Sequence, residues 1–280
     1  MTVIDGKKVA ASLKDSIAEQ VRKNGYTPGL AVIIVGDDPA SRIYVNNKKK
    51  ACEYCGFFSK EYSLAENTTQ SELISLIKRL NQDSSIDGIL CQLPLPEHLD
   101  EKAVIEAISP EKDVDAFSEI DVGKIMIGNY DFAPCTPSGV MELLRYYEID
   151  VAGKNAVVIG RSNIVGKPMA MLLLHADATV TLCHSKTRNL KELCRTADIV
   201  VSSVGKPDIV TADMVKEGAV VIDVGITRTQ GGKICGDVDF ENVKQKASFI
   251  TPVPGGVGPM TIAVLMQNTL RAYKKNKNIE

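Results

Sequence analysis

A lysine and a tyrosine one helical turn apart are the pair in this chain best suited to proton chemistry. Residues 39–55 predict a helix, and at about 100° per residue one stripe of it holds Ser41, Tyr44, Lys48, Cys52 and Cys55. Lys48 is the only charge on that stripe, so it must reach a partner or solvent, or lose its proton. Tyr44 and Lys48 can converge, and a lysine with a lowered pKa can act as a base. The alternative is a lysine that snorkels over a core tyrosine.

The cysteines predict neither a metal site nor a redox pair. Cys52 and Cys55 form a C-x-x-C at the end of the predicted helix, whereas a redox pair usually lies at a helix N-terminus. No second C-x-x-C completes a zinc site. The chain has seven scattered cysteines and no secretory signal at its start, so we expect reduced thiols in a cytoplasmic protein.

A strand that ends in glycine predicts a nucleotide site in the second half of the chain. Residues 155–159 are β-rich, Gly160 follows them, and Gly166 precedes a predicted helix. Glycine lets the backbone approach a pyrophosphate, and a helix N-terminus offers amides to it. The spacing is G-x5-G rather than G-x-G-x-x-G, so an ordinary strand-to-helix turn fits it as well.

The residues after the next strand favour NADP over NAD. An NAD site usually has a carboxylate at the end of the second strand, and an NADP site has a basic residue. The predicted strand 179–183 is followed by residues 184–188 (HSKTR), which include no carboxylate. Arg161 and Ser185 could hold a 2′-phosphate through charge-assisted hydrogen bonds. A solvated basic turn is the alternative.

A glycine- and proline-rich loop near the C-terminus predicts a second ligand contact. Residues 251–259 read TPVPGGVGP, and a predicted helix starts at Pro259. Such a backbone is stiff yet can approach a ligand closely, beside the amides of the helix start. A purely structural connection between loop and helix is the alternative.

Helices and strands alternate throughout the chain, which predicts parallel sheets covered on both faces. In the first half we expect helices at 7–24, 39–55, 69–80 and 102–108 around strands at 30–35, 57–64 and 86–93. From Thr136 the pattern restarts, with strands at 155–159, 179–183, 199–203 and 219–224 and helices at 137–147, 167–175, 190–195, near 213 and 259–274. The architecture expected is two α/β domains with a cleft between them.

Composition excludes several classes of protein. The 280 residues are 44% hydrophobic and 24% charged, as in a soluble globular protein rather than a disordered one. The net charge is −2, from 33 basic and 35 acidic residues, so we expect no nucleic-acid partner. The apolar runs are too short to span a membrane, so we expect no membrane partner either.

Six segments in this order resemble one family across nearly the whole chain. They are 41–48 (SRIYVNNK), 92–96 (QLPLP), 110–115 (PEKDVD), 134–137 (PCTP), 160–168 (GRSNIVGKP) and 252–261 (PVPGGVGPMT). The chain resembles the bifunctional methylenetetrahydrofolate dehydrogenase/methenyltetrahydrofolate cyclohydrolases. The resemblance implies oxidation of 5,10-methylenetetrahydrofolate with NADP+ to the 5,10-methenyl compound, and then hydrolysis to 10-formyltetrahydrofolate.

The resemblance also implies roles for the lysine stripe. Lys48 would be the key catalytic residue of the cyclohydrolase step, and Gln92 would hydrogen-bond and orient it. Tyr44 would stack on the aminobenzoyl ring of the folate. Asp115 would hold the pterin ring, and Pro254 and Gly255 would also contact the substrate.

On the cofactor side, Arg161 and Ser185 would bind the 2′-phosphate of NADP. The other residues that the resemblance places at the cofactor are Thr136, Gly160, Ser162, Ile164, Val165, Gly225, Ile226 and Thr261. It implies a folate-binding catalytic domain of residues 1–136 and 259–280 and a Rossmann-like NADP-binding domain of residues 137–258. It further implies a homodimer formed through the cofactor domain, and no metal.

One departure and two other functions stay open. The family often has asparagine where this chain has Asp121, which we interpret as a peripheral change. Another two-domain NADP-dependent dehydrogenase, such as a shikimate dehydrogenase-like enzyme, would give Gln92 and Asp115 no special role. A nucleotide sensor without redox turnover would tolerate the loss of Lys48.

Overall fold

The chain folds into two compact units, and its N-terminal residues belong to the second of them. The computed structural model describes residues 1–229 and 231–279 (for Ala40 only the backbone). Unit A comprises residues 11–135 and 262–280, and unit B comprises residues 1–10 and 136–261. The first ten residues group with unit B because β1 (Thr2–Val3) pairs with β11 (Phe249–Ile250). The functional division at residues 136/137 and 258/259 stays a prediction, as does the cleft.

Unit A is built on a three-stranded parallel sheet in the order β3-β2-β4. The strands are β2 (Gly29–Val35), β3 (Phe58–Leu64) and β4 (Gly88–Cys91). Every residue of β2 is buried, because each face of the sheet is covered. Its helices are α2 (Pro39–Cys55), α3 (Gln70–Gln82), α4 (Glu101–Ala107), α5 (Glu119–Met126) and most of α1 (Gly6–Asn24) and α10 (Val257–Asn276).

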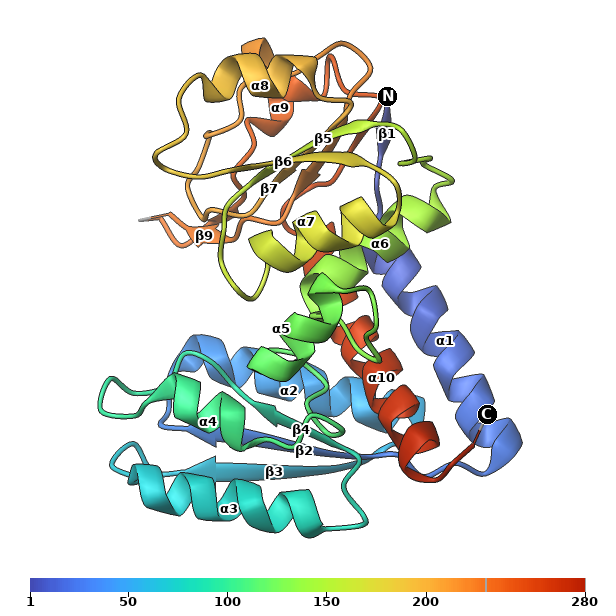
Figure 1. Ribbon diagram of the computed structural model, residues 1–280, viewed down its shortest axis with the longest axis vertical. Coiled ribbons are helices and arrows are strands. Elements are labelled where there is room, and N and C mark those ends of the chain that lie inside the picture. The colour runs from blue at the N-terminus through green and yellow to red at the C-terminus, as the bar shows by residue number, and fades with distance from the viewer. Residues whose placement is uncertain (230, 280) are drawn as a thin grey trace. The chain divides into compact units, whose positions relative to one another are not determined.

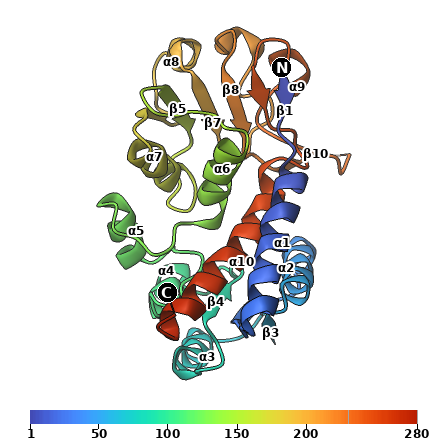
Figure 2. The same cartoon turned by 90° about the vertical axis from the view of Figure 1, so that its right-hand side faces the viewer.

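Alternate residues of β2 enter two different cores. Leu30, Val32 and Ile34 pack in a cluster with apolar residues of α1, α2 and α10. Ala31 and Ile33 pack in the other cluster, with residues of α3 and α4. The period of two in a strand therefore divides one apolar run between both faces of the sheet. Within unit A, α1 and α10 lie side by side (Figures 1 and 2).

The ends of α2 form as the sequence predicts. The Asp38 side chain accepts a hydrogen bond from the backbone N–H of Ser41 at 2.7 Å, and Pro39 occupies the first helical turn. Gly56 ends the helix in the left-handed conformation, at φ 74°. These caps fix where the helix starts relative to β2, and so where Lys48 lies.

Unit B contains a six-stranded parallel sheet in the order β1-β11-β8-β7-β5-β6. Its other strands are β5 (Asn155–Ile159), β6 (Thr179–Cys183), β7 (Ile199–Ser202) and β8 (Val220–Asp223). Its helical elements are α6 (Cys135–Tyr146), α7 (Gly166–His175), α8 (Leu190–Thr196), the short η1 (Ala212–Met214) and α9 (Phe240–Val243). A small antiparallel pair joins β9 (Thr227–Arg228) and β10 (Ile234–Cys235).

The strand order creates a switch point beside β5. The chain leaves β5 for β6 on one side and then returns to β7 on the other side. Nucleotides bind at the carboxyl ends of parallel strands at such a point. The Gly160 loop follows β5 and therefore lies at this place in the sheet.

The short strands β1, β9, β10 and β11 and the short helix α9 were not predicted, and two longer features also differ from the sequence-based expectations. Helix α5 was not predicted, although Ser118 caps it by accepting a hydrogen bond from the N–H of Asp121. Helix α10 starts at Val257, two residues before Pro259, which a first turn tolerates because its N–H groups need no helical partner. Among the described residues, no helix is long and apolar enough to cross a membrane.

Candidate functional site

Lys48 is buried and held by Gln92. Its side chain is 8% exposed, and its Nζ donates a hydrogen bond to Gln92 Oε1 at 2.9 Å. Gln92 follows β4, and its backbone N–H donates to Ile33 O at 2.8 Å. Its side-chain Nε2 donates to Leu93 O at 2.7 Å, which leaves the amide oxygen for the lysine. The sheet thus fixes both the place and the orientation of the glutamine.

Burial favours the neutral form of Lys48. Desolvation lowers the pKa of Lys48, and the Asp115 carboxyl is the charge that opposes this most. Burial likewise raises the pKa of Asp115, and the Lys48 ammonium opposes that shift. The structure therefore brings Lys48, Gln92 and Asp115 together in unit A, with a lysine whose pKa is lowered by burial.

Tyr44 differs from the rest of its stripe. Ser41, Cys52 and Cys55 are buried, as expected of an inward face. Tyr44 is 43% exposed, so Lys48 does not lie over a core tyrosine. An exposed ring one turn from a buried lysine is free to stack on a ligand. The cysteines are free thiols, as the spacing of Cys52 and Cys55 predicts.

Asp115 is positioned by residues that sequence reasoning missed. Asn268, on α10, donates hydrogen bonds from Nδ2 to Val114 O at 2.9 Å and to Ala133 O at 3.1 Å. Cys135 Sγ lies 3.5 Å from Asp115 Oδ1, and burial raises the pKa of its thiol. Asn268 is 4% exposed on an otherwise apolar helix face, and this lone buried amide is the signal that could have found it.

In unit B, the loop after β5 is shaped by two glycines. Gly160 has φ 119°, and a Cβ there would lie 2.6 Å from Ser203 Oγ. A Cβ on Gly166 would lie 2.0 Å from Gly160 O, so α7 starts in contact with the loop's own backbone. Ser162 Oγ accepts hydrogen bonds from the N–H groups of Val165 and Gly166, at 3.2 and 3.3 Å. This close strand–loop–helix packing is typical of a pyrophosphate site.

Replacing Gly166 with alanine is expected to weaken nucleotide binding. The added methyl would overlap backbone atoms, which have no rotamer to move away, so the loop or α7 must shift. We expect at least about tenfold weaker binding of NADP+, measured by calorimetric titration. The matched control is Gly123→Ala in α5, where a Cβ meets nothing within 4 Å. Equal NADP+ affinity in both variants would contradict the assignment of the loop.

The two residues predicted to hold a 2′-phosphate follow neighbouring strands. Arg161 lies after β5 and Ser185 after β6, and these strands pair in register with Ile159 opposite Cys183. Arg161 and Ser185 are both exposed. The turn after β6 is ordered by the backbone N–H of His184, which donates to Thr187 Oγ1 at 2.8 Å. An exposed cation beside a formed turn, with no carboxylate in it, suits an anionic ligand.

The other predicted cofactor residues divide into exposed and packed ones. Ile164 and Ile226 are 41% and 49% exposed, which is unusual for isoleucine and leaves an apolar surface for a ligand. Thr136 and Thr261 hydroxyls lie 3.0 Å apart. Gly225 is constrained by packing, because a Cβ there would lie 2.0 Å from Asp237 Oδ1.

Sequence reasoning missed two buried aspartates behind these loops. Asp237 accepts hydrogen bonds from Ser202 Oγ and from the N–H groups of Val204 and Lys206, at 2.7–2.9 Å. Asp223 accepts from the N–H groups of Gly225, Asp237 and Val238 at 2.9–3.0 Å. Burial raises the pKa of Asp223 to about 6. The two carboxyls tie together the loops after β7 and β8.

The glycine- and proline-rich loop packs closely against the start of the chain. Gly255 has φ 108°, a conformation that favours glycine. A Cβ on Gly6 would lie 1.7 Å from Gly256 O. The peptide bond between Val253 and Pro254 is cis. These contacts give the loop a structural role, and its predicted contact with substrate stays a prediction.

Comparison with known proteins identifies the family. The tetrahydrofolate dehydrogenase/cyclohydrolase catalytic domain matches residues 4–115, and the NAD(P)-binding domain of the same family matches residues 134–277. The chain belongs to the tetrahydrofolate dehydrogenase/cyclohydrolase family. It is 60% identical over 275 residues to the bifunctional protein FolD of Acetivibrio thermocellus, with 97% of this chain and 96% of that protein covered.

Solved structures of this family agree with the fold. The bifunctional enzyme FolD of Campylobacter jejuni superposes with a TM-score of 0.96 at 53% identity, covering 98% of this chain and 99% of that one. The methylenetetrahydrofolate dehydrogenase-cyclohydrolase of Trypanosoma brucei, solved with NADP cofactor and inhibitor, gives 0.93 at 42% identity, covering 98% of each chain. A shikimate dehydrogenase of Aquifex aeolicus gives 0.55 at 14% identity, which shows a shared fold only.

Several sequence-based predictions are thereby confirmed. The chain is a member of the predicted family, has the predicted two-domain α/β fold with an NAD(P)-binding domain, and is a dehydrogenase/cyclohydrolase enzyme. The interpretation of Asp121 as a peripheral change is wrong about its position. The Asp121 side chain is 1% exposed and lies in a network of polar contacts. No cluster of metal-ligating side chains occurs within the described residues.

Proposed function

We propose that this enzyme oxidises 5,10-methylenetetrahydrofolate with NADP+ and then hydrolyses the 5,10-methenyl product to 10-formyltetrahydrofolate. The observation that carries the proposal is the buried Lys48, hydrogen-bonded to Gln92 and opposed in charge by Asp115. NADP+ supplies the acceptor for the hydride that leaves the methylene carbon. Water then adds to the methenyl cation, and ring opening requires proton transfers.

In the folate site, each side chain takes the role that its surroundings support. Lys48 accepts and returns protons in the cyclohydrolase step, because burial makes its neutral form accessible. A cationic substrate beside it would lower the lysine pKa further. Gln92 orients the lysine, Asp115 holds the pterin ring, and the exposed ring of Tyr44 stacks on the aminobenzoyl group.

The chain's residues fit NADP rather than NAD. The Gly160 loop and the start of α7 suit a pyrophosphate, and the turn after β6 offers no carboxylate to a ribose hydroxyl. Arg161 and Ser185 hold the 2′-phosphate in this proposal. The remaining cofactor contacts are Thr136, Gly160, Ser162, Ile164, Val165, Gly225, Ile226 and Thr261, while Pro254 and Gly255 contact the substrate.

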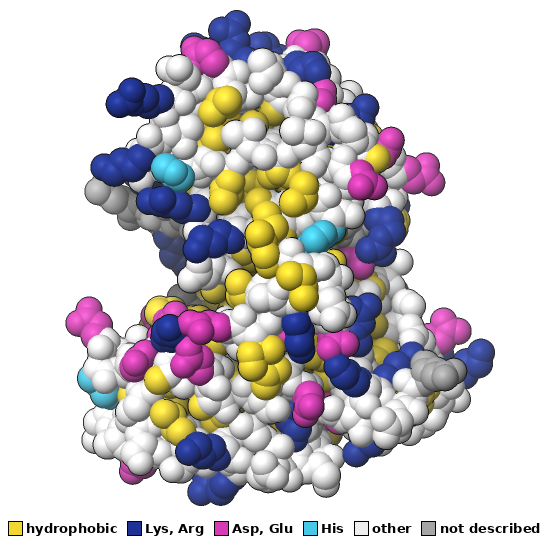
Figure 3. Space-filling model, viewed as in Figure 1, with side chains coloured by type: hydrophobic (Ala, Val, Ile, Leu, Met, Phe, Trp, Pro, Cys, Tyr) yellow, Lys and Arg dark blue, Asp and Glu magenta, His cyan; other side chains and the backbone are white. Residues whose placement is uncertain are grey.

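We also propose a cytoplasmic homodimer formed through unit B. On the face of unit B in Figure 3, apolar side chains gather over β6 and α7, where Leu182 and Leu174 are 37% and 49% exposed. Strand β6 is an edge strand, with a partner on one side only among the described residues. An apolar edge strand is a surface that a second copy can cover.

A spectrophotometric assay tests the two activities together. The enzyme is mixed with methylenetetrahydrofolate and NADP+, or NAD+ in parallel, and the absorbances of NADPH and methenyltetrahydrofolate are followed. We expect NADPH to form with little accumulation of the methenyl compound, and a direct hydrolysis assay to confirm the second step. Accumulation of the methenyl compound would leave a dehydrogenase with a weak cyclohydrolase. No turnover with either cofactor would contradict the proposal.

A further inference from the structure

The turn that carries Asp115 is wrapped around the carboxyl group of Asp113. Asp113 is 2% exposed, and Oδ1 accepts a hydrogen bond from Ala116 N–H at 3.0 Å. Oδ2 accepts from the N–H groups of Phe117 and Ser118, at 3.0 and 2.9 Å. Asp115 lies inside this turn, so the conformation of the turn sets where the Asp115 side chain lies.

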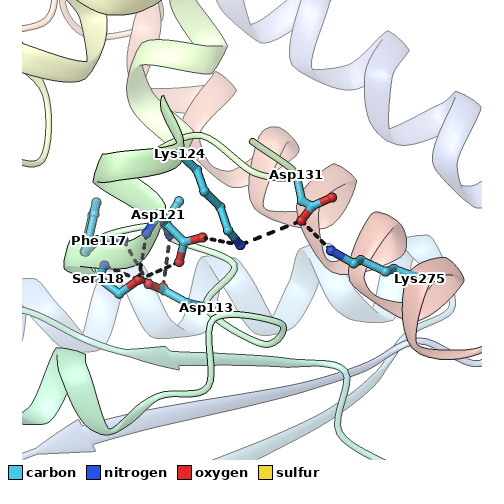
Figure 4. A network of polar contacts seen from close by, with 8 residues as sticks. Asp113, Phe117, Ser118, Asp121, Lys124, Asp131 and Lys275 are labelled. Atoms are coloured by element: carbon cyan, nitrogen blue, oxygen red, sulfur yellow. Dashed lines mark hydrogen bonds and ion pairs between the residues drawn. The ribbon is translucent and has the colours of Figure 1, made fainter. Parts of the chain in front are cut away.

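Asp121 joins this carboxyl group from the first turn of α5. Ser118 Oγ donates a hydrogen bond to Asp121 Oδ2 at 2.6 Å, and the backbone N–H of the same serine donates to Asp113 Oδ2, so the two carboxyl groups converge on Ser118 (Figure 4). Two ionised carboxylates that converge on one serine in a buried place repel each other, whereas a proton kept by one of them removes this repulsion. The geometry therefore calls for one proton between two buried aspartates.

The positive charges around Asp113 and Asp121 compensate the negative charge of these two aspartates only in part. Lys124 Nζ lies 3.7 Å from Asp121 Oδ1, but it also lies 3.9 Å from Asp131, which pairs with Lys275 of α10 (Figure 4). On the other side, Asp115 adds a negative charge facing Asp113. The nearby Glu119 of α5 is already paired with Lys102 of α4, at 2.7 Å. Two ionised aspartates would therefore leave an excess of negative charge in a buried place.

We propose that Asp113 and Asp121 are positioning residues for the folate substrate, and that a proton shared between them holds the turn carrying Asp115 in its binding conformation. The inference rests on the proposed role of Asp115. An asparagine at residue 121 could donate an N–H without a proton equilibrium, so the proposal depends on the carboxyl group that this chain has there.

The proposal makes folate binding depend on pH in a stated direction. Burial, and then the charges of Asp115 and Asp121, raise the pKa of Asp113 to about 7 against the opposing backbone N–H groups. Burial also raises the pKa of Asp121. As pH rises through about 7 the pair loses its proton, the two carboxylates repel, and the turn loosens.

The test is the KM for methylenetetrahydrofolate as a function of pH in the unaltered enzyme and in Asp121→Asn. For the unaltered enzyme we expect KM to rise about fivefold between about pH 6 and about pH 8.5. For Asp121→Asn we expect less than about a twofold rise, because an amide at residue 121 carries no charge that could repel Asp113 at any pH. The KM for NADP+ is expected to stay the same in both. Asp131→Asn is the matched control, since it removes a charge of the same network but leaves the pair, and it should keep the fivefold rise.

Stability supplies a readout that needs no folate. The native pair keeps a proton that an unfolded carboxyl, with a pKa of 3.8, has released, so the free energy of unfolding falls as pH rises from there to about 7. We expect this fall to be smaller in Asp121→Asn, measured by denaturant unfolding at each pH. The other carboxyls are the same in both proteins and cancel in the difference.

The outcomes separate this proposal from the function on which it rests. A KM that rises equally in the unaltered enzyme and in Asp121→Asn would overturn the positioning role, and unchanged stability profiles would overturn the shared proton. Asp115→Asn is measured in parallel, and we expect its KM for folate to rise at least about tenfold at every pH. If Asp115→Asn leaves folate KM unchanged while Asp121→Asn alters the stability profile, the assignment of Asp115 fails and the shared proton stands.

Discussion

Lys48→Met is expected to abolish cyclohydrolase activity. Methionine fills a similar volume in the buried stripe of α2 but cannot accept or return a proton. Positioned acid–base groups contribute about 10²- to 10⁴-fold, so we expect hydrolysis of methenyltetrahydrofolate to fall by at least about 100-fold. The measurement is the loss of methenyl absorbance, corrected for the uncatalysed reaction in the same buffer.

The control for this variant lies one residue further along the helix. Lys49 is exposed, so Lys49→Met removes a charge from α2 without touching the buried stripe, and we expect full activity. NADP+ affinity should be unchanged in both variants, because the proposed cofactor residues belong to unit B. An unchanged rate of methenyltetrahydrofolate hydrolysis in Lys48→Met would contradict the proposed role of Lys48 in the cyclohydrolase step.

The same lysine gives the cyclohydrolase step a pH dependence. Burial lowers the pKa of Lys48, so its neutral, proton-accepting form is populated at lower pH than in an exposed lysine. We therefore expect the catalysed rate to rise with pH through that lowered pKa and then to level off. Gln92→Met removes the hydrogen-bond acceptor of Lys48 and should shift this profile as well as reduce the rate.

Arg161→Gln is expected to weaken NADP+ binding by about 10- to 100-fold, which corresponds to the loss of charge-assisted hydrogen bonds to a phosphate. Glutamine keeps hydrogen-bonding capacity and lacks the positive charge. Binding of NAD+, which has no 2′-phosphate, should change by less than about twofold, so the preference between the two cofactors is the decisive quantity. Both affinities are measured by titration calorimetry.

An arginine elsewhere in unit B provides the comparison for Arg161. Arg195 is an exposed residue of α8, and Arg195→Gln makes the same change in net charge. We expect it to leave both cofactor affinities unchanged at moderate salt, where charges further apart than about 10 Å are screened. Equal weakening of NADP+ and NAD+ by Arg161→Gln would place the arginine near the cofactor but away from a 2′-phosphate.

Local chemistry explains why much of the fold could be predicted. The ends of α2 follow from Asp38, Pro39 and Gly56, whose preferences act within a few residues. Helix α3 likewise begins with the capping box expected for Thr69 and Glu72. The burial of Lys48 could be predicted only as a choice between alternatives, because its hydrogen bond to Gln92 joins residues 44 positions apart.

The unpredicted parts depend on contacts between distant segments. Asn268 holds the peptide groups of Val114 and Ala133 across more than 130 positions. Asp237 closes the loops after β7 from over 30 positions away. A helical wheel or a strand pattern contains no information on such pairs, since each partner alone is an ordinary polar residue. Asp121 was misplaced for a different reason, because it is buried in the first turn of α5, a helix that was not predicted, although its partner Ser118 is only three positions away.

The division of the chain has a consequence for its synthesis. The core of unit A contains six residues of α10 from Val264 onward, namely Val264, Leu265, Met266, Leu270, Ala272 and Tyr273. A ribosome releases these residues after the rest of unit A and after unit B, so the apolar sides of α1, α2 and the sheet stay uncovered until α10 has emerged. Strand β1 is synthesised long before β11, so it likewise has no partner until β11 has emerged. Unit A therefore cannot complete its core while the chain is still being synthesised from the N-terminus towards α10. A chain that is truncated before α10 would expose this incomplete core to aggregation or proteolysis.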